Sequence, residues 1–195
     1  ADAYVLLAEE EADTLGRARE YYQKGVEAGE RALGEAFFDE NEGYFWGLLE
    51  TRPYMRAREG LANTLWNLGE KEEALTHYWE MLRLNPGDNQ GVRYSLLNLL
   101  LELNRPDQVD TLLDEHNDDW SSEWRYTQVL RVFQKEGDSP AAKEALEEAL
   151  EQNPHVPDYL TGAKRIPNRL PDMISPGRES EAVSFASTHL NFWRK

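Results

Sequence analysis

The sequence predicts an all-α fold, a solenoid of about four helical hairpins closed by a C-terminal helix. Unlike residues recur at a displacement of 68, which is twice 34: Asn85-Pro86 returns as Asn153-Pro154, and Gly69-Glu70 as Gly137-Asp138. A period of 34 is typical of helix-turn-helix repeats. Between these marks the apolar residues follow the three- and four-residue spacing of helices. The 195 residues are 40% hydrophobic, which is enough for a continuous core.

The first 34 residues are interpreted as a degenerate repeat. Ala18 and Tyr22 keep the spacing of Ala74 and Tyr78 in the clearer repeat downstream. The second helix of this repeat is expected to continue to about Phe37. Because Ala18 and Ala74 are 56 residues apart where 34 are expected, about 22 extra residues lie between the two repeats.

The extra residues form an insertion over 35–54, the most aromatic part of the chain. It contains Tyr44, Phe45 and Trp46. Such a cluster either anchors a partner at an interface or folds back as a core plug. The plug, centred on Trp46, is favoured because Leu48 and Leu49 follow at once and would hold the segment down.

Two segments, 55–88 and 123–156, are predicted to be well-formed helical hairpins. In the first, Gly69 separates the helices and Asn85-Pro86 ends the second one. In the second, Gly137 separates the helices, and Ser139 caps a helix that begins with Pro140.

Residues 89–122 have apolar spacing but no terminal proline, so they are interpreted as a degenerate repeat. Its second helix should end near His116, and Ser121 or Ser122 should cap the next helix. Residues 157–195 are expected to cap the fold, with a short helix, a proline-rich loop and a closing amphipathic helix over Ser180 to Trp193.

These repeats resemble the tetratricopeptide repeat (TPR) family, with Arg58, Val92 and Tyr126 where that family usually has tryptophan. The stretches ETRPYMRA and NPGDNQGVRY are also similar to an uncharacterised bacterial subgroup of that family. The resemblance implies a right-handed, TPR-like superhelix whose first helices line a concave groove for a peptide or a partner helix. A shared fold does not by itself give a function.

The composition argues against several classes of partner and location. The chain has 37 acidic and 21 basic residues, a net charge of −16, which opposes binding to nucleic acid or to anionic lipid. It has no cysteine for a disulfide or a thiolate site. With neither a long apolar run nor a signal-peptide pattern at the start, a cytoplasmic location is expected.

No pattern in the sequence supports catalysis, a cofactor or a metal site, so the chain is interpreted as a non-enzyme. No two of the four histidines have the helical spacing that would place two metal ligands on one face. The acidic turn Asp39 to Gly43 lacks the alternating ligands and the distant glutamate of a calcium loop.

The predicted binding residues lie on the first helix of each hairpin. Arginine forks bind carboxylates in a bidentate manner, so an acidic segment or a free C-terminus is the expected ligand. The alternative, left open, is that these arginines pair with neighbouring glutamates. The predicted partner-binding residues are Arg56, Asn63, Trp66, Arg93, Trp124 and Arg131.

The sequence therefore predicts a protein-protein interaction scaffold that binds a peptide or protein segment in its concave groove. A second hypothesis is a regulatory or substrate-presenting domain of a larger enzyme or assembly. Self-association through the terminal helix around Phe192 and Trp193 is a third, so the expected state is a monomer or a weak homodimer.

Overall fold

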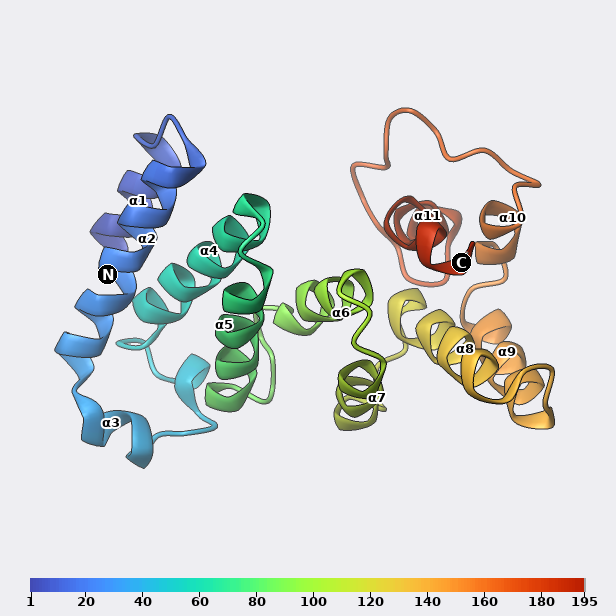
Figure 1. The fold of residues 1–195 in the computed structure, drawn as a ribbon, viewed down its shortest axis with the longest axis horizontal. Helices are drawn as coiled ribbons and strands as arrows, with labels where there is room; N and C mark the ends of the chain where they lie inside the picture. The colour runs from blue at the N-terminus through green and yellow to red at the C-terminus, as the bar shows by residue number, and fades with distance from the viewer. Residues whose placement is uncertain (195) are drawn as a thin grey trace. The chain divides into compact units, whose positions relative to one another are not determined.

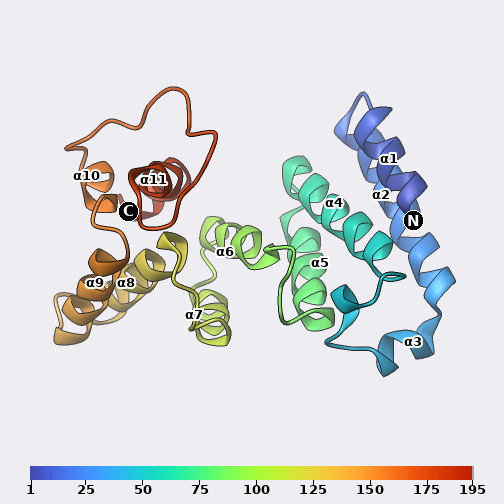
Figure 2. The same ribbon diagram turned by 180° about the vertical axis from the view of Figure 1, so that it is seen from behind.

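The computed structural model describes residues 1–194, and all regular structure in them is helical, with eleven α-helices and one short 3₁₀ helix (Figures 1 and 2). The all-α prediction is confirmed for this part of the chain. The chain divides into two compact units, Ala1–Leu99 and Leu100–Lys195. No helix within residues 1–194 has the length and hydropathy of a membrane-spanning segment.

The N-terminal unit is built on helical hairpins. In it α2 packs against both α1 and α4, and α4 packs against α5. The hairpin predicted for 55–88 is present as α4 and α5, separated by Gly69 in the left-handed conformation with φ of 84°. The elements are α1 (Asp2–Glu10), α2 (Leu15–Leu33), α3 (Glu35–Glu40), η1 (Phe45–Gly47), α4 (Arg52–Leu68), α5 (Lys71–Leu84) and the larger part of α6 (Val92–Glu102).

The close packing of α2 on α4 depends on small residues. A Cβ atom added to Gly29 would lie 2.8 Å from the side chain of Tyr54, and one added to Gly25 would lie 2.9 Å from Ala57. Real Cβ atoms avoid such distances, so a larger residue at either glycine would push the helices apart. The small residues of α2 therefore allow α4 to approach closely.

The structure corrects the expectation that the second helix continues to Phe37. It ends at Leu33, because Gly34 has φ of 80° and ψ of 152°, which is not helical. The short helix α3 then begins a new direction. A φ in this range is accessible to glycine without the steric cost that other residues bear.

The inserted segment does fold back as a plug, but the plug is Phe45 rather than Trp46. Phe45 is fully buried, and its ring lies 5.0 Å from that of Phe38 and 6.1 Å from that of Tyr54. Trp46 is only partly buried, and Leu49 is 72% exposed, so Leu49 does not hold the segment down. The Thr51 hydroxyl holds the turn by contacting the Phe45 and Leu48 carbonyl oxygens.

The C-terminal unit contains the end of α6 and five further helices. The predicted caps are confirmed: Ser121 Oγ accepts a hydrogen bond from the Trp124 N–H at 3.3 Å, and Ser139 Oγ accepts one from the Ala142 N–H at 3.1 Å. The helices are α7 (Pro106–Glu115), α8 (Ser122–Glu136), α9 (Pro140–Gln152), α10 (Val156–Leu160) and α11 (Glu179–Trp193).

A helix is present near the C-terminus, as expected, and it contributes to the core of this unit. Phe185 of α11 is fully buried, and its ring lies 5.6 Å from that of Tyr126 on α8. His189 is also buried and stacks on Phe185 at 4.3 Å. Burial lowers the pKa of His189 to about 4, so its ring is neutral at pH 7 and belongs to the core.

Candidate functional site

The N-terminal unit contains an open pocket of about 490 Å³ between α2, α3, α4 and α5. Gly34 ends α2, and the following helix α3 adds Glu35, Phe38 and Asp39 to the pocket lining. The wall combines aromatic rings with charges of both signs. It is lined by Glu30, Arg31, Glu35, Phe38, Asp39, Tyr54, Arg58, Glu80 and Arg83.

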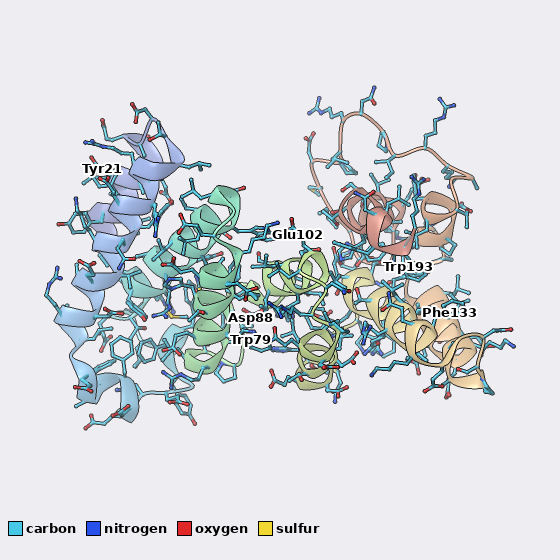
Figure 3. The ribbon with its side chains drawn as sticks, viewed as in Figure 1. Tyr21, Trp79, Asp88, Glu102, Phe133 and Trp193 are labelled. Carbon is cyan, nitrogen blue, oxygen red and sulfur yellow. The ribbon has the colours of Figure 1, made fainter. Side chains whose placement is uncertain are left out.

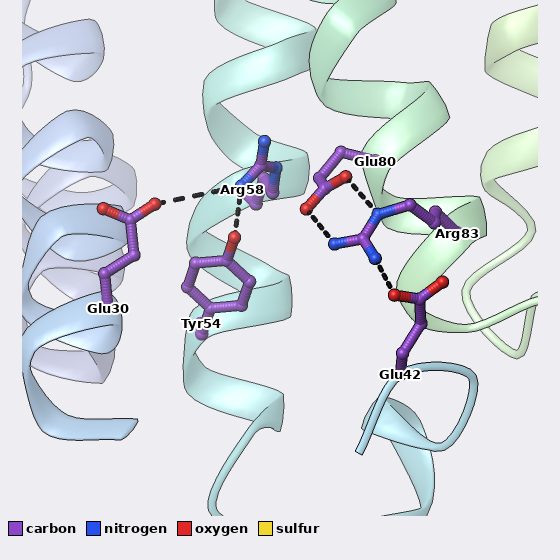
Figure 4. Close-up of polar contacts among 6 residues, drawn as sticks. All are labelled: Glu30, Glu42, Tyr54, Arg58, Glu80 and Arg83. Carbon is purple, nitrogen blue, oxygen red and sulfur yellow. Dashed lines mark hydrogen bonds and ion pairs between the residues drawn. The ribbon is translucent and has the colours of Figure 1, made fainter. Parts of the chain in front are cut away.

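The floor of the pocket is formed by Tyr54 and Arg58, one helical turn apart on α4. A guanidinium N–H of Arg58 donates to the Tyr54 hydroxyl, and the same nitrogen lies 3.9 Å from the Glu30 carboxylate (Figure 4). The Arg58 side chain is 12% exposed. Its Nε–H is buried and has no hydrogen-bond acceptor in the described chain. Arg58 is thus a buried cation with incomplete hydrogen bonding.

One wall of the pocket is a closed charge cluster on α5. Arg83 donates from Nε and Nη2 to the two oxygens of Glu80 at 2.7 and 2.8 Å, and it also pairs with Glu42 from the inserted segment (Figure 4). The hydrogen bonds from Arg83 lower the pKa of Glu80. Arg83 therefore has its carboxylate partners already, in contrast to Arg58.

The nearby His77 adds no positive charge at neutral pH. Burial, with a smaller contribution from the charge of Arg58, lowers the pKa of His77 to about 4. The positive charge at the floor therefore belongs to Arg58.

The α3 residues at the rim of the pocket carry unpaired carboxylates. Glu35 and Asp39, on consecutive turns of α3, are exposed and have no ion-pair partner in the described chain. With Glu30 and Glu80, four carboxylates and three guanidinium groups line the pocket. The site can therefore bind a group that carries both signs of charge.

The sequence-predicted residues Asn63 and Trp66 lie together on α4, around Tyr78 of α5. The Tyr78 hydroxyl donates to Asn63 Oδ1 at 2.5 Å, and the ring of Trp66 meets that of Tyr78 edge-on at 6.4 Å. Arg56, also on α4, pairs instead with Asp2 of α1 at 2.6 Å.

Arg93 is held by Asp88, which is labelled in Figure 3. The buried Asp88 carboxylate accepts from the N–H groups of Val92 and Arg93 at 2.7 and 3.0 Å, and from Arg93 Nη1 at 2.9 Å. This carboxylate caps α6 and neutralises the arginine at the same time.

The remaining two predicted residues, Trp124 and Arg131, lie on α8 in the C-terminal unit. Trp124 is fully buried, so it is a core residue and not an exposed anchor. Arg131 makes a bidentate pair with Asp110 at 2.9 and 3.0 Å. It also borders a second pocket of about 280 Å³ that includes Val109, Gln134 and Phe192.

All three predicted arginines are thus engaged by carboxylates, but these belong to aspartates and not to the glutamates that the alternative interpretation named. Sequence reasoning missed Tyr54, Arg58 and Arg83. The available signal was the helical spacing of Tyr54 with Arg58 and of Glu80 with Arg83. That signal does not show that residues of α3 line the same pocket as these side chains.

Comparison with known proteins identifies relatives of the whole chain. The family model described as "ST7 protein" matches residues 1–195. The chain is 29% identical over 219 aligned residues to the "Suppressor of tumorigenicity 7 protein" of Macaca fascicularis, and equally to those of Rattus norvegicus and Mus musculus. All of this chain is aligned, but it spans only 40% of the macaque protein and 37% of the rat and mouse proteins.

These matches overturn the assignment to the tetratricopeptide repeat family and to a bacterial subgroup of it. The relatives are mammalian proteins, and the matching family model is a different one. The repeat pattern misled because any two closely packed antiparallel helices need small residues at the contact and a breaker between them. The chain belongs to the ST7 protein family.

Proposed function

We propose that this chain is a protein-interaction module that binds a peptide or protein segment. The observation that supports this is the open pocket between α2 and α5, with the buried Arg58 guanidinium at its floor. A mostly buried cation is costly unless negative groups lie near it, and a ligand carboxylate in the pocket can add to the interaction that Glu30 provides.

The pocket replaces the predicted arginines Arg56, Arg93 and Arg131 as the favoured contact point. A ligand at Arg93 or Arg131 would have to displace a carboxylate that is already in hydrogen-bond contact. Arg58 has Glu30 at 3.9 Å, and its charge helps to lower the pKa of Glu80, but it makes no hydrogen bond to either carboxylate in the described chain. A ligand carboxylate therefore has less to displace at Arg58.

We propose further that the hairpins of the N-terminal unit stack in chain order as a right-handed solenoid. The packing of α2 on both α1 and α4 supports this, because a solenoid requires each element to contact its neighbours. A cytoplasmic, non-enzymatic protein without a cofactor or metal, existing as a monomer or weak homodimer, is part of the same proposal.

The proposal is tested by affinity capture with the purified chain from its native host, followed by mass spectrometry. A captured protein should then bind the purified chain in a defined ratio by isothermal titration calorimetry. The charge-reversed variants Arg93→Glu and Arg131→Glu, checked for folding, show whether these two arginines contribute to partner binding. If both bind the captured protein as the native chain does, the contact point lies elsewhere, as proposed for the pocket. If no protein is enriched over the tag alone, the interaction role is rejected.

A second candidate is a regulatory or substrate-presenting part of a larger enzyme or assembly. The mammalian relatives support it, because they extend well beyond the aligned region. Their name describes suppression of tumorigenicity, an outcome that a protein acting through partners can produce. Co-elution of an enzymatic activity with the native protein, lost when this region is deleted, would favour this alternative.

A further inference from the structure

We propose that the pocket between α2 and α5 binds one carboxylate flanked by basic residues, as in a peptide with an acidic side chain between lysines or arginines. This inference rests on the proposed function and names the chemistry of the ligand.

The floor of the pocket selects the carboxylate. The Arg58 guanidinium is planar and always charged, its side chain is 12% exposed, and a planar carboxylate is its matching partner. Glu30 leaves room for such a partner, because its half-exposed carboxylate lies 3.9 Å from Nη1, beyond hydrogen-bond distance.

The rim selects the basic flanks. Glu35 and Asp39 are exposed and unpaired in the described chain, and the whole chain has a net charge of −16. A purely acidic segment would be repelled before it reached Arg58. Lysine or arginine on each side of the acidic residue offsets this repulsion and can pair with Glu35 and Asp39.

The rings of Phe38 and Tyr54 suit the aliphatic part of such flanking side chains. Phe38 and Tyr54 meet edge-on with ring centroids 5.2 Å apart, and both line the pocket. A lysine stem can lie along these rings while its ammonium group reaches the α3 carboxylates.

A single negative charge is favoured over a phosphate group. Four carboxylates line the same pocket, and Arg83 is already bound to Glu80 and Glu42. A phosphate carries about two charges at pH 7, so it would meet roughly twice the repulsion from these carboxylates.

The test is a titration of the isotope-labelled whole chain by NMR with short capped peptides. The reference peptide has one aspartate between two lysines, and the matched peptides carry asparagine, phosphoserine or flanking alanines instead. We expect shifts at Tyr54 and Arg58 with the reference peptide. We expect about tenfold weaker binding or more for asparagine, because the charge-assisted bond is lost. Phosphoserine and flanking alanines should also weaken binding.

Two variants locate the site. Arg58→Lys keeps the positive charge but removes the bidentate guanidinium, so the affinity for the reference peptide should fall about tenfold. Glu35→Gln combined with Asp39→Asn should remove the preference for lysine flanks. Arg125→Lys, in the other unit, should change nothing. If Arg58→Lys does not fold, the comparison of aspartate and asparagine peptides on the native chain still decides.

The proposal is overturned if aspartate and asparagine peptides bind equally, if phosphoserine binds more tightly, or if the shifts lie away from Tyr54 and Arg58. It is also overturned if folded Arg58→Lys binds the peptide as well as the native chain does. These results would leave the interaction role intact whenever the native chain still captures a partner. The absence of any captured partner would instead reject the proposed function itself.

Discussion

Glu181, at the start of α11, is a buried carboxylate that is held by neutral donors. It accepts from the backbone N–H groups of Ser122 and Gly177 at 3.1 and 2.7 Å, and from the side-chain amides of Gln152 and Asn153 at about 3 Å. Burial alone would raise the pKa of Glu181, but these hydrogen bonds lower it overall. The carboxylate joins the loop before α11 to α8 and α9.

The variant Glu181→Gln should therefore be destabilising. An amide NH₂ cannot accept the donors that the second oxygen accepts, so we expect the free energy of unfolding at pH 7 to fall by about 2–3 kcal/mol. Urea denaturation followed by circular dichroism measures it. Glu179→Gln, two residues earlier in an exposed pair with Lys164, is the control and should shift the midpoint far less. Equal losses in both variants would contradict this role.

Glu123 differs from Glu181, because its pKa is raised in the folded protein and not lowered. Burial first, and then the charges of Glu181 and Asp119, raise the pKa of Glu123 to about 7. Its stabilising contribution is complete below the unfolded value near 4.5 and is lost as the pH rises through about 7.

We therefore expect Glu123→Gln to make the protein more stable at pH 8, by on the order of 1–3 kcal/mol. The difference from the native chain should disappear toward pH 5. Urea midpoints at intervals between pH 5 and 8 measure this. A constant difference across that range would show that Glu123 does not titrate there.

Among the helices, the crossing of α2 and α4 is the contact that depends most on sequence detail. Gly25 and Gly29 of α2 face Ala57 and Tyr54 of α4, and Gly60 of α4 faces the ring of Tyr22. Each glycine lowers the intrinsic stability of its helix, and close packing of the two helices offsets that loss.

Replacing Gly29 by alanine should therefore destabilise the N-terminal unit. The gain in helix propensity is about 1 kcal/mol, but the clash with Tyr54 at 2.8 Å should cost more, giving a net loss of about 1–2 kcal/mol. Gly16→Ala is the matched control in α2. No atom lies within 4 Å of its added Cβ, so it should be neutral or stabilising. Thermal denaturation of both variants separates the effect of steric crowding against Tyr54 from the effect of helix propensity.

For the molecule as a whole, the dominant property is its charge. A net charge of −16 on 195 residues creates a self-repulsion that many exposed ion pairs offset only weakly. Pairs such as Lys143 with Asp138, both more than 60% exposed, contribute little.

Stability should therefore increase with ionic strength. Raising sodium chloride from about 20 to about 200 mM shortens the Debye length and screens the repulsion more than it weakens the pairs. We expect the thermal midpoint to rise by several degrees. Choline chloride should have the same effect if screening is the cause. A falling midpoint would show that ion pairs outweigh the repulsion, and an effect of sodium alone would indicate a bound cation.

The sequence by itself determined the helices and most of their ends. Gly69 ends one helix, and the hydroxyls of Ser121 and Ser139 begin two others, because caps and breakers act within a few residues of the backbone they control. The helix end at Gly34 was predicted wrongly, although it too was decided by a local φ, because nothing nearby marked that glycine as a breaker rather than a packing residue. The helix predicted to begin at 55 begins at Arg52, within the predicted insertion.

Only the tertiary structure decided which charges meet and where a pocket forms. Arg83 pairs with Glu42, 41 residues away, and Arg131 with Asp110, 21 residues away. In a chain with 37 acidic residues, helical spacing offers each arginine several partners, and the choice depends on how the helices pack. Arg58 lies in a pocket because residues of four helices, from Glu30 to Arg83, meet there, and Phe45 helps to hold Phe38 of α3 against Tyr54 of α4.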